Sequence, residues 1–299
     1  MAITLISEEE YQYWKNAGKL TKQVKEYAKS IAKQGMPIVS FAALVEEKIR
    51  LLGAQPAFPI NISFNSCAAH DTADQNDTRC FGNDLVKIDL GVAINGYFGD
   101  TAFTLDFTTQ YRLLVEAAEK ALDNAIAIAK PGVTIGKIGK TIQETIQQYG
   151  FVPISNLSGH GLARYEIHTE PTIPNYDTGS AVELKKGMIL AIEPFATNGH
   201  GRIIESGKPR IFSLQNNSQP RSPHARKVLE LIKPHKTLPF SLRDFEGKIN
   251  EGVLLLGIKE LLQQKIVRAY PPLVEISKGM VSQAEHTILI TATGCEILT

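Results

Sequence analysis

KIDLGVAINGYFGDTAFTLDF, residues 87–107, is the stretch of this 299-residue sequence that decides the fold. From position 88 to 95, large apolar residues alternate with small or polar ones, and this period of two is typical of a β-strand. Asn95-Gly96 then predicts a tight turn, because both residues tolerate positive φ angles. The sequence continues into a second strand after the turn. The stretch therefore predicts a two-stranded antiparallel hairpin.

Each predicted strand of this hairpin carries one carboxylate, Asp89 on the outgoing strand and Asp100 on the returning strand. An unpaired carboxylate in apolar surroundings is costly, so each of the two requires a positive partner. The partner is either an Arg or Lys side chain or a divalent metal ion, because acids on neighbouring strands suit one or two such ions. The hairpin alone leaves both options open.

Composition excludes several classes of protein. The hydrophobic share is 43%, the charged share is 21% and the net charge is +1, so the chain is globular and nothing global indicates a nucleic-acid or membrane partner. No apolar run approaches the roughly 20 residues that span a bilayer. The start of the sequence turns acidic at once, so we expect no signal peptide. Cys67, Cys80 and Cys295 are scattered, which favours a reduced cytoplasmic protein. We also expect a monomer.

Helical and strand patterns surround the hairpin. Ser7 and Glu10 have the spacing of a capping box, which predicts a helix that begins after Ser7 and ends before Gly35. The segment 67–83 is polar and predicts a loop. Further helices are expected over 40–52, 109–129, 134–149, 224–232, 242–256 and 258–267. Strands are expected over 61–65 and 188–195, and again after residue 270.

Further polar residues lie in apolar or glycine-rich surroundings. His160 is flanked by two glycines, Glu193 lies within the apolar run MILAIEPF, and Glu285 precedes the apolar HTILIT. With Asp89 and Asp100 they make a set of four carboxylates and one imidazole. This set suits manganese, iron(II), cobalt or zinc more than a structural zinc, which usually recruits thiolates. Such a set can hold two ions about 3.5–4 Å apart, and a pair of this kind activates water for hydrolysis.

Five motifs occur in order along the chain, and together they resemble the methionine aminopeptidases of metallopeptidase family M24. They are Lys87-Ile-Asp89-Leu-Gly91, Asp100, Gly159-His160-Gly161, Ile192-Glu193-Pro194 and Glu285-His286-Thr287. Other details resemble the type 2 enzymes: Cys67-Ala-Ala-His70, His168 eight residues after His160, a long insertion before Glu285, and Tyr270-Pro-Pro-Leu273. Ser66 replaces the Asn of the type 2 motif. The sequence begins without the extension of the eukaryotic enzymes, so we expect the compact archaeal form.

The resemblance implies a role for each matching residue. Asp89 would chelate one metal ion, Asp100 and Glu285 would bridge two ions, and His160 and Glu193 would complete the shell of the other. Glu193 is also the candidate for proton relay. His70 and His168 would bind the scissile carbonyl or amide and stabilise the tetrahedral intermediate. Phe58, Ile167, Phe195 and Tyr270 would line the pocket for the methionine side chain. For Phe58 and Phe195, ordinary core packing is an equal alternative.

The resemblance also implies the fold and the domain organisation. We expect an α/β (α+β) pita-bread fold, in which helices flank a curved antiparallel sheet that carries the metal ions on its concave face. The catalytic domain would comprise residues 1–195 and 270–299. An inserted helical, winged-helix-like subdomain would comprise residues 196–269.

The implied activity is removal of the initiator methionine from nascent chains whose second residue is small, with two divalent ions (cobalt, manganese, iron(II) or zinc) and possible action at the ribosome. Two alternatives remain open. A prolidase-like dipeptidase shares the fold and ligands, but it normally has a large domain before the catalytic one. A catalytically inactive relative that binds ribosomes or RNA would have lost metal ligands, and all five are present here.

Overall fold

A computed structural model of the chain describes residues 7–299. Residues 1–6, which hold the first part of the predicted catalytic domain and much of the start that argues against a signal peptide, lie outside the described residues. The predicted hairpin is confirmed as β4 (Leu85–Ile94) and β5 (Tyr97–Asp106), which pair antiparallel. Asn95 and Gly96 form its turn with φ angles of 52° and 85°. Gly91 faces Asp100 in this register, so the two carboxylates lie close together.

The helices and strands combine in a mixed α/β fold whose strand pairs are all antiparallel. The α-helices are α1 (Glu8–Ile31), α2 (Ile38–Leu51), α3 (Arg112–Ile128), α4 (Ile135–Gln148), α5 (Pro223–Ile232) and α6 (Glu251–Gln263), and the 3₁₀ helices are η1 (Lys233–His235) and η2 (Leu242–Phe245). The remaining strands are β1 (Gln55–Pro56), β2 (Asn61–Phe64), β3 (Cys67–Ala69), β6 (Val152–Pro153), β7 (Ser158–Ala163), β8 (Glu166–Pro174), β9 (Ile189–Ile192), β10 (Phe195–Thr197), β11 (Ile203–Glu205), β12 (Ile211–Leu214), β13 (Phe240–Ser241), β14 (Val267–Tyr270), β15 (Leu273–Glu275), β16 (Val281–Gln283), β17 (His286–Ile290) and β18 (Cys295–Ile297).

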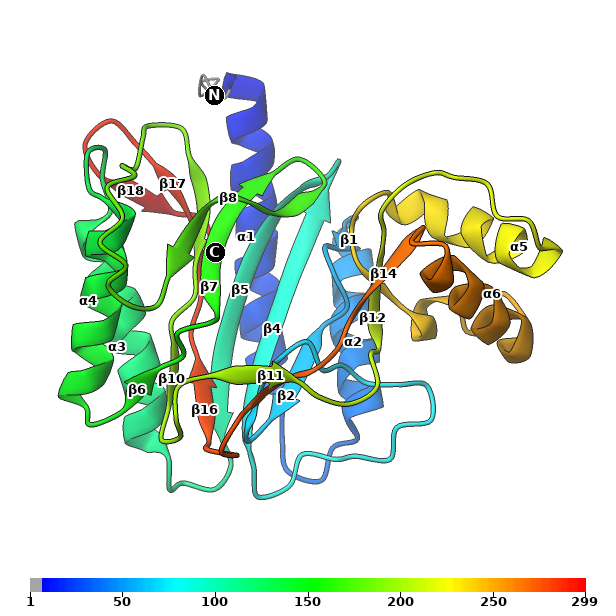
Figure 1. Cartoon of the computed structure of the whole chain (residues 1–299), viewed down its shortest axis with the longest axis horizontal. Coiled ribbons are helices and arrows are strands. Elements are labelled where there is room, and N and C mark those ends of the chain that lie inside the picture. The colour runs from blue at the N-terminus through cyan, green and yellow to red at the C-terminus, as the bar shows by residue number, and fades with distance from the viewer. Residues whose placement is uncertain (1–6) are drawn as a thin grey trace.

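Two helix pairs support the strands from outside. The pair α1 and α2 lies behind β4 and β5, and the pair α3 and α4 covers β6, β10 and β16 at the left of Figure 1. The first strand group has the order β1-β4-β2 with β5 beside β4, and the second has the order β18-β17-β9-β7-β8. Each helix pair buries its own apolar core. This arrangement leaves one face of the strands free to build a site, as the pita-bread fold requires.

The first helix shows why the local sequence predicts its own structure. The Ser7 hydroxyl accepts a hydrogen bond from the Glu10 N–H at 3.2 Å, and the Glu10 carboxylate accepts one from the Ser7 N–H at 2.9 Å. This is the predicted capping box, which satisfies backbone donors that a helix leaves free at its start. Trp14, Val24 and Ala28 on one face of the helix are buried.

Threonine side chains join the two strand groups where β5 meets β16 and β17. The Thr287 hydroxyl accepts a hydrogen bond from the Asp100 N–H at 2.8 Å and donates one to the Asp100 carbonyl at 2.9 Å. The Thr101 hydroxyl donates to the Glu285 carbonyl at 2.7 Å. These buried bonds hold the backbones of Asp100 and Glu285 next to each other, although the two residues are far apart in sequence.

The structure corrects three local predictions. The segment 67–83 is not entirely loop, because Cys67–Ala69 forms β3 and pairs with β15. The two helices expected over 242–256 and 258–267 are replaced by η2 and the single helix α6, since Asn250 caps a new helix start and Ile266 leads into β14. Glu193 lies at the break between β9 and β10 rather than within a strand.

The segment between β11 and β15 packs largely on itself. Helices α5 and α6 and the three-stranded sheet β13-β12-β14 enclose a separate hydrophobic core, at the right of Figure 1. Arg243 in this segment donates two hydrogen bonds to the Glu46 carboxylate of α2, at 2.7 and 2.8 Å. The division at residues 196–269 stays a prediction. Among residues 7–299, no helix has the length and apolar character needed to cross a membrane.

Candidate active site and metal centre

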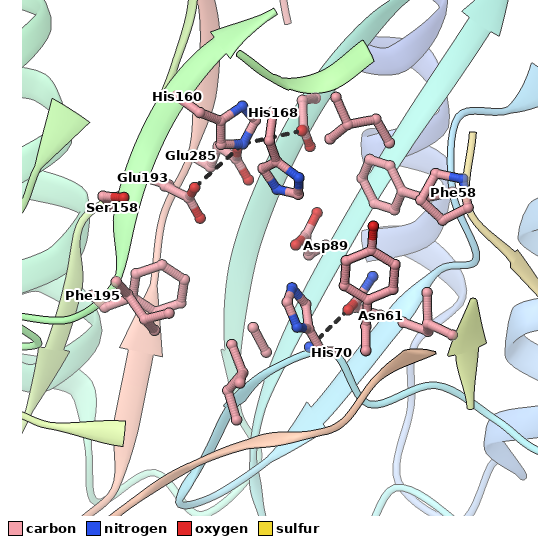
Figure 2. Close-up of a pocket in the computed structure, with 18 of the residues that line it drawn as sticks. Phe58, Asn61, His70, Asp89, Ser158, His160, His168, Glu193, Phe195 and Glu285 are labelled. Atoms are coloured by element: carbon pink, nitrogen blue, oxygen red, sulfur yellow. Dashed lines mark hydrogen bonds and ion pairs between the residues drawn. The ribbon is translucent and has the colours of Figure 1, made fainter. Parts of the chain in front are cut away.

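All of the residues that the sequence analysis proposes for the site line one cavity of about 250 Å³ (Figure 2). They come from separate parts of the chain and meet on the free face of the strands. The lining residues among them are Phe58, His70, Asp89, Asp100, His160, Ile167, His168, Glu193, Phe195, Tyr270 and Glu285.

The candidate metal ligands gather at one end of the cavity. Ligand atoms of Asp100, His160 and Glu285 all lie within 4.8 Å of one another, and all three residues are buried. The His160 Nε2 atom lies 3.5 Å from a Glu193 oxygen and 4.0 Å from an Asp100 oxygen. Figure 2 shows the Asp89 carboxylate facing the same space, between the rings of His168 and His70. This spacing is close enough for the side chains to share metal ions.

The carboxylates of Asp89, Asp100, Glu193 and Glu285 are buried close together, where their negative charges would repel one another. Burial raises the pKa of Asp100, and the neighbouring Asp89 raises it further. Burial is also the main reason that the pKa values of Asp89, Glu193 and Glu285 are raised. Clustered buried carboxylates are costly unless a cation compensates them.

Buried oxygens without a hydrogen-bond partner indicate whether this set of side chains suits divalent cations. One oxygen each of Asp89, Asp100 and Glu285 is buried and has no hydrogen-bond partner in the part of the chain that the structure describes. The hairpin left pairing with lysine or arginine as the other option. Among residues 7–299, the four carboxylates form no ion pair with a lysine or an arginine; His160 is the basic side chain with which Asp100 and Glu193 pair. Oxygen and imidazole donors with unused lone pairs suit manganese, iron, cobalt or zinc. The residues present therefore fit a divalent metal centre.

His70 lies across the cavity from His160 and is held in an unusual backbone conformation. Its φ angle is 63°, and its N–H donates a hydrogen bond to the side-chain oxygen of Asn61 at 2.9 Å. The His70 ring contacts the Tyr270 ring edge-on, with the ring centres 5.7 Å apart. Burial, with smaller contributions from His168 and Arg268, lowers the pKa of His70 to about 4. The imidazole is therefore neutral at neutral pH.

His168 lies beside the candidate metal ligands at the mouth of the cavity. Its ring packs edge-on against the His160 ring, with the centres 4.4 Å apart. Protein packed around the ring lowers the pKa of His168, and the positive charge of Arg268 lowers it further. Both non-ligand histidines are thus neutral hydrogen-bonding groups that point into the cavity.

The remaining walls of the cavity are largely apolar. Phe58, Ile167 and Phe195 are buried, and the Tyr270 hydroxyl is hydrogen-bonded to the Ser213 hydroxyl at 2.9 Å. Phe58 and Phe195 each belong to a hydrophobic core cluster and also line the cavity. The two interpretations of Phe58 and Phe195 are therefore compatible.

Sequence reasoning missed several residues of the site. Gln283 lies next to Glu193, with its Nε2 atom 3.4 Å from a carboxylate oxygen. Strand alternation could have found it, because it lies two residues before Glu285. Asn61 fixes the His70 backbone, and no motif indicated this. Other lining residues that were not predicted are Ala69, Asn156, Leu157, Ser158, Ile211, Pro239 and Leu273.

The fold and the site together define a class of protein, the metal-dependent hydrolases built on the pita-bread fold. A match to metallopeptidase family M24 covers residues 12–292. The chain belongs to this family. It is 46% identical to the methionine aminopeptidase of Archaeoglobus fulgidus over 286 residues, which are 95% of this chain and 96% of the relative.

Solved structures have the same fold. The methionine aminopeptidase of Thermotoga maritima superposes with a TM-score of 0.71 at 27% identity and covers 99% of both chains. The prolidase of Pyrococcus furiosus superposes with a TM-score of 0.64 at 23% identity, and there 99% of this chain covers only 65% of the prolidase. The second likeness shows the shared fold alone.

Proposed function

We propose that this chain is a methionine aminopeptidase of type 2, which removes the N-terminal methionine from proteins whose second residue is small. The observation that carries the proposal is the meeting of all five candidate metal ligands in one cavity with an apolar wall. The family match and the 46% identity to an archaeal methionine aminopeptidase support it. The type 2 assignment rests on the motifs around His70, His168 and Tyr270 and on the long insertion.

The metal centre of the proposal contains two divalent ions. Asp89 would chelate one ion, His160 and Glu193 would bind the other, and Asp100 and Glu285 would bridge them. When bound, ions of this kind supply an activated water molecule and polarise the scissile carbonyl group. The donor set contains no thiolate, so cobalt, manganese, iron(II) and zinc are the candidates.

The two non-ligand histidines would bind the peptide bond that is cleaved. Because the lowered pKa values keep His70 and His168 neutral, each ring can donate one N–H to a carbonyl oxygen and hold that bond as negative charge develops. The Glu193 carboxylate, 3.5 Å from the His160 Nε2 atom at the edge of the same centre, is the candidate to accept a proton and release it to the departing amine. In this proposal, His70 and His168 each keep a proton that faces the substrate, and Glu193 transfers one.

The apolar wall would select the methionine side chain. Phe58, Ile167, Phe195 and Tyr270 line the cavity, and burial of each CH₂ group there stabilises the complex by about 0.8 kcal/mol. An unbranched thioether side chain adapts well to such a wall. The acidic ligands next to this wall would favour a substrate with a free, positively charged N-terminus.

The proposed setting is the cytoplasm, where the substrates would be nascent chains that leave the ribosome and the enzyme would act as a monomer. The three cysteines are unpaired, as expected for a protein of a reducing compartment.

A panel of Met-Xaa-Ser peptides tests the proposed function. Each peptide is assayed with the metal-free protein reconstituted with cobalt, manganese, iron(II) or zinc. We expect release of methionine when Xaa is Gly, Ala or Ser, and little release when Xaa is Leu or Phe. Failure to cleave any peptide with any of the four metals would contradict the proposal.

Prolidase-like activity is the alternative that the shared fold favours, so Gly-Pro is included in the panel. Cleavage of Gly-Pro without cleavage of Met-Ala-Ser would favour the dipeptidase. A catalytically inactive binding protein is the third candidate. Purified protein that binds no metal and cleaves neither substrate would favour that class.

A further inference from the structure

We propose that Arg210, at the start of the inserted segment, is a positioning residue that holds His70 in place through an ion pair with Asp71. The inference rests on the proposed function, in which His70 binds the scissile carbonyl. It gives the inserted segment a second task, besides the supply of Ile211 and Pro239 to the cavity wall.

The Asp71 carboxylate is buried, and its two oxygens have different partners. Arg210 Nη1 donates a hydrogen bond to one oxygen at 2.7 Å, and Arg79 Nη1 donates to the other at 2.5 Å. Arg79 belongs to the same loop as Asp71 and also pairs with Asp77. Arg79 therefore shares its single positive charge between Asp71 and Asp77. Arg210 supplies a second positive charge, which also lies 3.8 Å from an Asp74 oxygen, and links Asp71 to another part of the molecule.

The two residues that follow His70 are fixed to β2 and to the residue before it, and Ala69, which precedes His70, pairs with Leu273 of β15. The Ile62 N–H donates to the Asp71 carbonyl at 2.7 Å, and the Thr72 hydroxyl donates to the Ile60 carbonyl at 2.6 Å. His70 itself has a φ angle of 63°, which a residue with a side chain adopts only when its surroundings hold it there. Contacts of the neighbouring residues thus determine where the imidazole points.

The same strand pair of the insertion touches this dipeptide twice. Arg210 binds Asp71, and the next residue, Ile211, lines the cavity and lies opposite Tyr270 in the β12–β14 register. The Tyr270 ring in turn packs edge-on against His70. The ion pair and the ring contact therefore connect His70 and Asp71 to neighbouring positions of the β12–β14 pair. Loss of the ion pair leaves the ring contact as the link between this strand pair and His70.

The test compares Arg210→Gln with the control Lys208→Gln. Lys208 loses the same charge two residues away and forms no ion pair among the described residues. With Met-Ala-Ser and one metal, we expect Arg210→Gln to lower kcat on the order of tenfold, because a small misplacement of a catalytic group is costly. We expect KM to change by no more than about twofold. Lys208→Gln should match the wild type, and Arg210→Lys should recover part of the rate.

A second readout follows the His70 ring directly. In ¹⁵N-histidine NMR spectra of the metal-loaded protein, Arg210→Gln should shift the His70 ring signals and leave those of His235, which packs against Phe240 and Phe245 in the insertion, unchanged. The combination of Asp71→Asn with Arg210→Gln should cost less than the sum of the two single changes, as for residues that act through one contact.

Three results would overturn the proposal. They are an unchanged kcat in folded Arg210→Gln, unmoved His70 signals, and loss of bound metal in this variant, which would place the effect at the metal centre. If the wild type failed to cleave Met-Ala-Ser, the proposed function would fall, whereas the His70 signals would still decide whether Arg210 positions the ring.

Discussion

Asp100 is the residue on which the site depends most directly. It is buried, its backbone is hydrogen-bonded on both sides to the Thr287 hydroxyl, and its side chain lies within metal-sharing distance of His160 and Glu285. Thr287 fixes the backbone that carries the carboxylate. The neighbouring acids make a negative charge on this carboxylate unfavourable unless a cation compensates it. A residue held in this way serves binding of a metal rather than stability of the metal-free fold.

We predict that Asp100→Ala loses bound metal and at least roughly a hundredfold in kcat/KM, because it removes the ligand that we propose both ions share. Metal content by mass spectrometry and peptide kinetics check this. Asp100→Asn is the matched control, since it keeps the volume and removes a repelled charge, so it should fold as well as the wild type and still lose metal. Full metal content with normal turnover in either variant would refute the assignment.

We predict that His168→Ala keeps its metal but loses on the order of 10²-fold in kcat, because a neutral hydrogen-bond donor to the peptide bond is removed. His200→Ala is the control, since this exposed histidine lies outside the cavity and should leave kcat unchanged. An unchanged kcat/KM for His168→Ala would remove the residue from the mechanism.

At the residue scale, the sequence predicts which side chains meet when each carries its own signal. Acids in apolar strands and a histidine between glycines indicate buried polar groups from their sequence neighbours alone. Asn61, Ile211 and Pro239 carry no such signal. They line the cavity because distant strands bring them there, and the register between β12 and β14 is not encoded in either strand alone.

At the element scale, local patterns succeed where the pattern and the packing agree. The hairpin of β4 and β5 was predictable because alternation and an Asn-Gly turn indicate the same structure. The elements of the inserted segment were harder to predict from the sequence. Gly247, with a φ angle of 71°, breaks the helical pattern between η2 and α6. Ile266, at the bend before β14, and Val267, in β14, are buried by the core around α5 and by the pairing with β12 rather than by their own periodicity.

A half-buried titratable group beside the core of the insertion makes the stability of this segment depend on pH. The His235 ring packs against Phe240 and Phe245, with ring centres 5.6 and 5.7 Å away. Burial, and to a smaller extent the charge of Lys248, lowers the pKa of His235. The unfolded chain takes up a proton near the ordinary pKa of about 6.5 while the folded chain resists it. Stability is therefore present above that pH and is lost as the pH falls.

We predict that His235→Gln loses less stability than the wild type when the pH falls from 7 to 5. The glutamine cannot take up a proton in this range, so the contribution of this site to the pH dependence disappears. Urea unfolding at both pH values, followed by circular dichroism, measures the difference. The same loss in both proteins would show that His235 does not contribute.

At the scale of the whole molecule, the candidate metal centre joins the two strand groups. Asp89 and Asp100 come from the hairpin, whereas His160, Glu193 and Glu285 come from the second group and its connections. Without a cation, the fold must bring four repelling carboxylates together in buried surroundings. We therefore expect divalent ions to stabilise the fold where the two strand groups meet, in addition to their proposed part in the chemistry.

We predict that a divalent metal raises the thermal unfolding temperature of the metal-free protein. A ligand at 100 times its Kd adds about 2.7 kcal/mol to the free energy of unfolding, which for a chain of this size corresponds to roughly 4 °C. Differential scanning calorimetry with and without manganese measures the shift. Asp100→Asn should show little shift, and an equal rise in that variant would point to metal binding elsewhere.

The central claim is that five side chains from distant parts of the chain form one centre for two divalent ions, and that this centre cleaves peptides that begin with methionine. The most direct measurement titrates metal-free protein with manganese and follows bound metal per chain and Met-Ala-Ser cleavage in the same samples. We expect cleavage to rise with occupancy and to level off at two ions per chain. Full cleavage by the metal-free protein, or no cleavage at full occupancy, would contradict the claim.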